Sequence, residues 1–84
     1  MLTARQTVET YFLEARHMLL EVAALLDRHD AAAARDEAPR TGTAAGDAAA
    51  REKLAILREA LAVLASEPCD GERTARLLDL FARV

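Results

Sequence analysis

With 84 residues and a mass of 9.1 kDa, the chain has room for one small domain, and its many alanines and leucines beside three glycines and two prolines favour helices. A formal net charge of −3 argues against a protein held to nucleic acid or anionic lipid by bulk charge, and one cysteine excludes an internal disulfide. No apolar run approaches the ~20 residues that span a bilayer. We therefore expect a cytoplasmic all-α protein without a membrane span or secretory leader.

The first helix is predicted over residues 4–29, opening at a capping box formed by Thr3 and Gln6. Apolar residues then fill positions a, d and e of a heptad that starts at Val8, which predicts one continuous apolar helix face. We call this face the N-terminal stripe; it consists of Val8, Tyr11, Phe12, Ala15, Met18, Leu19, Val22, Leu25 and Leu26. Leu13 and Leu20 project away from the stripe and form a second, smaller apolar strip.

Residues 30–47 are predicted to be a linker. They hold two glycines, one proline and no large apolar side chain, so burial cannot offset the entropy lost on ordering. We expect a mobile centre at Pro39–Gly46 and partly helical, alanine-rich ends.

The second helix is predicted over residues 48–65, with Asp47 as its N-cap. Leucines at a and d spacing form what we call the leucine row: Leu54, Leu57, Leu61 and Leu64. Ile56, Ala60 and Val63 widen the apolar arc, which is typical of a helix that touches two neighbours.

A break at Ser66–Gly71 separates this helix from a third, predicted over residues 71–83 and capped by Asp70. Its predicted buried side consists of Leu77, Leu78 and Phe81, and is flanked by Leu80 and Val84.

Together these elements predict a small helical bundle: a long helical hairpin plus a short C-terminal helix, completed by dimerisation. The predicted first helix is longer than the second, so a lone hairpin would leave part of the stripe uncovered, and small cores commonly gain stability by association. The predicted interface residues are Leu13, Leu20, Tyr11, Met18, Ile56 and Val63. The leading interpretation is thus a non-enzymatic helical protein that forms a homodimer and binds another, unknown protein.

A metal-binding helical bundle is the first alternative. Glu14 and His17 have Glu-x-x-His spacing, Glu21 follows, and a second helix could add Glu52 or Glu59. However, Glu14 and Glu21 fall at position g and His17 at c, outside an intact a/d seam, so we expect a solvated polar face and no cofactor. His29 lies twelve residues beyond His17, about 18 Å along one helix, so the two cannot share a metal ion.

A DNA-binding regulator is the second alternative, with the last two helices as a helix-turn-helix and Arg73, Thr74, Arg76 and Arg83 facing the duplex. The break is longer than the usual turn and the chain is net acidic, so we expect no nucleic-acid partner. A catalytic role for Cys69 is disfavoured, because no second cysteine and no neighbouring histidine could assist it.

The stretch YFLEARHMLLEVAALLDRHD, residues 11–30, resembles short bacterial all-helical proteins of unknown function. The resemblance implies no activity or catalytic residue. It directs attention to four polar residues that can form neighbouring ion pairs: Glu14, Arg16, Asp27 and Arg28.

Overall fold

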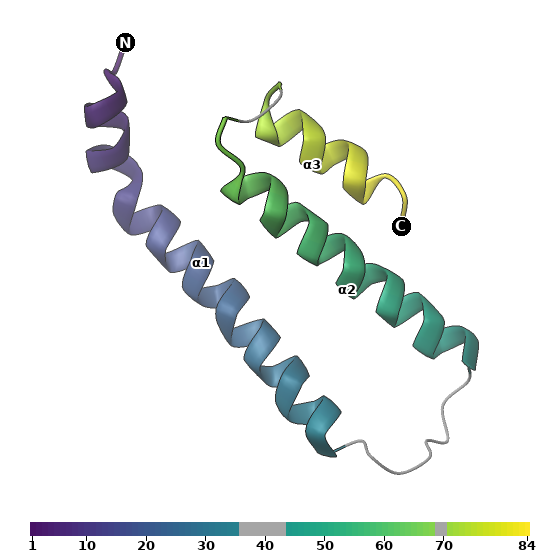
Figure 1. Ribbon diagram of the computed structural model, residues 1–84. Helices are drawn as coiled ribbons and strands as arrows, with labels where there is room; N and C mark the ends of the chain where they lie inside the picture. The colour runs from purple at the N-terminus through teal and green to yellow at the C-terminus, as the bar shows by residue number, and fades with distance from the viewer. Residues whose placement is uncertain (36–43, 69–70) are drawn as a thin grey trace. The chain divides into compact units, whose positions relative to one another are not determined.

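The computed structural model describes residues 1–35, 44–68 and 71–84, and the regular structure among them is entirely α-helical (Figure 1). Helix α1 spans Ala4–Arg35, α2 spans Ala44–Ala65 and α3 spans Arg73–Phe81. The predicted all-α class is confirmed. The chain divides into two compact units: Met1–Arg40, which contains α1, and Thr41–Val84, which contains α2 and α3.

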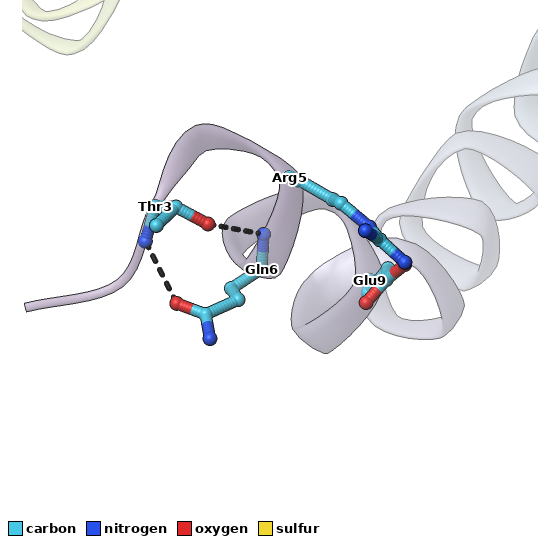
Figure 2. A network of polar contacts seen from close by, with 4 residues as sticks. All are labelled: Thr3, Arg5, Gln6 and Glu9. Atoms are coloured by element: carbon cyan, nitrogen blue, oxygen red, sulfur yellow. Dashed lines mark hydrogen bonds and ion pairs between the residues drawn. The ribbon is translucent and has the colours of Figure 1, made fainter.

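The capping box predicted at the start of α1 is present (Figure 2). The backbone N–H of Gln6 donates to the Thr3 hydroxyl at 3.1 Å, and the backbone N–H of Thr3 donates to the Gln6 side-chain oxygen at 3.0 Å. One turn on, Arg5 pairs with Glu9 at 3.1 Å. The first turn thus satisfies donors that a helix otherwise leaves unpaired.

Both helices beside the predicted linker extend into its alanine-rich ends, which the sequence predicts to be partly helical. Helix α1 continues past residue 29 to Arg35, and α2 begins at Ala44 rather than residue 48. The reason is alanine, which has the highest helix propensity: residues 31–34 are all alanine, and α2 gains Ala44 and Ala45 at its start. Asp47 consequently lies in the first turn of α2 instead of capping it, where its carboxylate still favours the helix dipole. The rest of the predicted linker, residues 36–43, lies outside the described residues.

Helix α3 lies along α2, and the two share the buried core found among the described residues (Figure 1). From α2 the core takes Ile56, Ala60 and Val63, which stand at helical i, i+4 and i+7 positions; from α3 it takes Leu80. Leu77 packs against this cluster from its edge.

Helix α3 begins two residues later than predicted, at Arg73 instead of residue 71. Its N-cap is Glu72, whose backbone is extended and whose side chain makes no capping bond. Gly71 has a φ of +81°, a left-handed conformation that cannot continue into a right-handed helix. Helix α3 therefore begins at Arg73 and ends at Phe81. The predicted cap, Asp70, lies outside the described residues.

The predicted buried side of α3 is also wrong in part. Leu78 is 67% exposed and Phe81 42% exposed, whereas Leu80 is only 8% exposed. Leu80 follows Leu77 by three residues and shares its face, whereas Leu78 is rotated by about 100° from Leu77. The structure selects the Leu77/Leu80 face for contact with α2.

The leucine row of α2 lies beside this contact and is only partly covered. Leu54 and Leu61 are half-buried, while Leu57 is 37% and Leu64 44% exposed. Helix α3 thus covers the arc of Ile56, Ala60 and Val63 and leaves a second apolar arc of α2 open.

Candidate functional site

The N-terminal stripe is a continuous apolar face that α1 leaves exposed. Helix α1 contains no buried residue, although the stripe runs through most of its length. The stripe members with large exposed side chains are Val8, Tyr11, Phe12, Met18, Leu19, Val22 and Leu25. Their exposed fractions run from 39% at Val22 to 64% at Val8.

The exposed stripe is large for a surface patch. Its seven large side chains, with exposed fractions of 39% to 64%, together present on the order of several hundred Å² of mostly apolar surface. Monomeric proteins rarely leave a contiguous apolar patch of this size open. The stripe is therefore the best candidate functional site on the chain.

Leu13 and Leu20 occupy a different side of α1, as their spacing predicts. Their side chains are 74% and 53% exposed. They add a narrow apolar strip one heptad long, separate from the stripe.

Two predicted interface residues of the second unit already have a partner within the chain. Ile56 is 5% and Val63 8% exposed, and both pack in the core with Leu80. Tyr11 and Met18, in contrast, are 51% and 52% exposed. Of the predicted interface residues, those of α1 are thus the ones open to contact.

The polar residues considered for metal binding do not converge. His17 Nε2 lies 3.3 Å from Glu21 Oε1, one turn along the same helix, and both side chains are about 70% exposed. Nowhere in residues 1–35, 44–68 and 71–84 do three or more histidine, cysteine, aspartate or glutamate side chains form a group able to hold a metal ion. Glu52 and Glu59 belong to α2, and Glu59 is engaged by Arg83 at 3.2 Å.

Two of the arginines considered for DNA binding are directed at their own chain. Arg73 donates to the backbone carbonyl of Ser66, and Arg83 pairs with Glu59. Residues 66–72 separate α2 from α3, a longer connection than the three- to four-residue turn of a helix-turn-helix. Arg76 lines a shallow hollow with Asp79, so acidic and basic groups alternate on this side of α3.

A second hollow lies where α2 meets the C-terminal end of the chain, and it was not anticipated from the sequence. It is apolar, measures about 230 Å³, and is lined by Lys53, Ile56, Leu57, Phe81 and Val84. Its lining comes from two helices and depends on which face α3 turns to α2, so no local pattern signals it. It contains no convergent polar groups that could carry out a reaction.

No protein-family model matches the chain, and no curated protein or solved structure matches it either. None of the described helices is long and apolar enough to cross a membrane. Cys69 lies outside the described residues.

Proposed function

We propose that this protein is a non-enzymatic helical interaction module that acts as a homodimer, and that the N-terminal stripe is its contact surface. One observation carries the proposal: α1 presents a continuous apolar face along most of its length and buries no residue. The residues that this surface uses include Tyr11 and Met18. Ile56 and Val63 are left out of it, because α3 already covers them.

The energetics of α1 support a partner. The helix has 32 residues and an N-terminal capping box, but most of the stability of helices in proteins comes from packing an amphipathic face. The exposed stripe gives α1 such an amphipathic face, and a partner helix that covers it would supply the packing that the described chain does not.

The absence of enzymatic activity is part of the proposal. It is supported by the polar pairs on the described helices, which are exposed ion pairs typical of solvated faces. The strip of Leu13 and Leu20 stays exposed when the stripe is covered, and we assign it to a second protein partner. We place the module in a bacterial cytoplasm, because the excess of arginine over lysine and the abundance of alanine are typical of GC-rich bacterial genomes.

Substitution at the centre of the stripe tests this function. Met18→Glu puts a charge into the proposed contact while keeping a good helix former, so the molar mass from size-exclusion chromatography with light scattering should fall from dimer to monomer. The matched control is Ala24→Glu, which adds the same side chain on the exposed opposite side of α1 and should leave the dimer intact. A wild-type protein that elutes as a folded monomer contradicts the proposal.

A further inference from the structure

We infer that two copies of this chain pair through α1 in an antiparallel, two-fold arrangement. In this arrangement Val8 of one copy faces Leu25 of the other, so the numbers of facing stripe residues add up to about 33. The inference rests on the proposed function and specifies its geometry. In this register each a position of one copy faces a d position of the other, and the contact is the same seen from either copy. The occupant of the stripe is thus the stripe of a second copy.

The area of the stripe fits this occupant. Because the contact is isologous, each copy contributes the same seven large exposed side chains, so the whole patch of one copy can be covered by that of the other. The antiparallel register also uses the whole stripe, since its first large residue, Val8, meets its last d residue, Leu25.

The sizes of the side chains select the antiparallel direction. In this direction Ala15 faces Met18, Tyr11 faces Val22 and Val8 faces Leu25, so the smallest stripe residue meets a long one and the largest meets a small one. A parallel pair in register would place Ala15 against Ala15 and Tyr11 against Tyr11. That would leave a void in one layer and overcrowd another, and both defects destabilise a packed interface.

The antiparallel direction also determines which residues meet along the two edges of the stripe. On one edge, position e of each copy meets position e of the other, which brings Phe12 beside Leu19 and extends the apolar contact. On the other edge, position g meets position g, which brings Glu14 of one copy near Glu21 of the other. This repulsion acts between solvent-exposed carboxylates, so it is weaker than the packing defects of the parallel alternative.

Disulfide trapping distinguishes the two directions. In a Cys69→Ser background, Val8→Cys and Leu25→Cys are prepared separately, then mixed, oxidised and analysed by mass spectrometry. In the antiparallel pair, residue 8 of one copy lies about 26 Å along the axis from residue 8 of the other, far beyond disulfide reach, while it faces residue 25. We expect the mixture to form the 8–25 heterodisulfide and Val8→Cys alone to stay reduced. An 8–8 disulfide in Val8→Cys alone overturns the inference.

A second measurement leaves the stripe untouched. A spin label at Arg28→Cys, in the same Cys69→Ser background, lies off the stripe near one end of the contact. The antiparallel pair places the two labels about 35 Å or more apart, whereas a parallel pair places them within about 25 Å. A label-to-label distance within about 25 Å overturns the antiparallel arrangement but leaves the proposed homodimer in place. A monomeric molar mass by light scattering contradicts both the arrangement and the proposed function.

Discussion

The packing of α3 gives the sharpest test of the second unit, because two neighbouring leucines behave oppositely. Leu80 is 8% exposed and lies in the core with Ile56, Ala60 and Val63, whereas Leu78 is 67% exposed. Truncation of a buried leucine to alanine costs about 2–5 kcal/mol through lost transfer energy and the cavity left behind. In a core as small as this one the neighbours can relax toward the gap, so we expect Leu80→Ala to lower the free energy of unfolding by about 2–3 kcal/mol.

Leu78→Ala is the matched control, since it removes the same atoms from the same helix. It should change the free energy of unfolding by no more than about 0.5 kcal/mol, as is usual for exposed positions. Urea unfolding monitored by circular dichroism at one protein concentration measures both values, and hydrogen exchange of the α3 amides localises the effect. If Leu78→Ala proved as costly as Leu80→Ala, the assigned face of α3 would be wrong.

Three further predictions concern single contacts. Thr3→Ala removes the capping box, whose two hydrogen bonds measure 3.0 and 3.1 Å, and should destabilise the start of α1 by about 1 kcal/mol. Amide hydrogen exchange in the first turn of α1 should then be roughly five-fold faster, whereas Thr3→Ser should retain most of the protection. In Gly71→Ala the added methyl group meets no atom within 4 Å, but the alanine must adopt a φ of +81°. The free energy of unfolding in urea should therefore fall by about 1–2 kcal/mol, and by less in Gly71→Asn. An unchanged unfolding midpoint in Gly71→Ala would argue against the left-handed turn. A double-mutant cycle on the exposed pair of Arg83 and Glu59 should give a coupling energy of about 0.2–1 kcal/mol, and this energy should be smaller in 1 M salt. A larger coupling energy that does not depend on salt would contradict the exposed geometry of the pair.

Local signals in the sequence were sufficient wherever neighbouring residues determine the structure. The capping box of Thr3 and Gln6 is such a case, because both partners lie within one turn and the hydrogen bonds follow from their spacing. The periodicity of the N-terminal stripe likewise predicts a helix from local spacing alone. The helix ends were less predictable, since alanine propensity competes with the breaking effect of glycine and proline, and the balance is only tenths of a kcal/mol per residue.

Contacts between helices were harder to predict. In α3, Leu77, Leu78, Leu80 and Phe81 leave two faces almost equally apolar, and only the fit against Ile56, Ala60 and Val63 decides between them. The apolar hollow beside Phe81 follows from that choice and could not be anticipated without it. For the candidate site, the sequence predicts Tyr11, Met18, Leu13 and Leu20 as interface residues; this stays a prediction, because a contact with a second chain is not determined by the local spacing that predicts the helix.

Sedimentation equilibrium of the wild-type protein across a wide concentration range tests the central claim most directly. The proposed dimer has twice the mass of the 9.1 kDa chain, 2 × 9.1 = 18.2 kDa, and should dissociate only on dilution, with a loss of helical signal as α1 loses its partner. A mass of 9.1 kDa at every concentration, with the helical signal unchanged, would contradict the account.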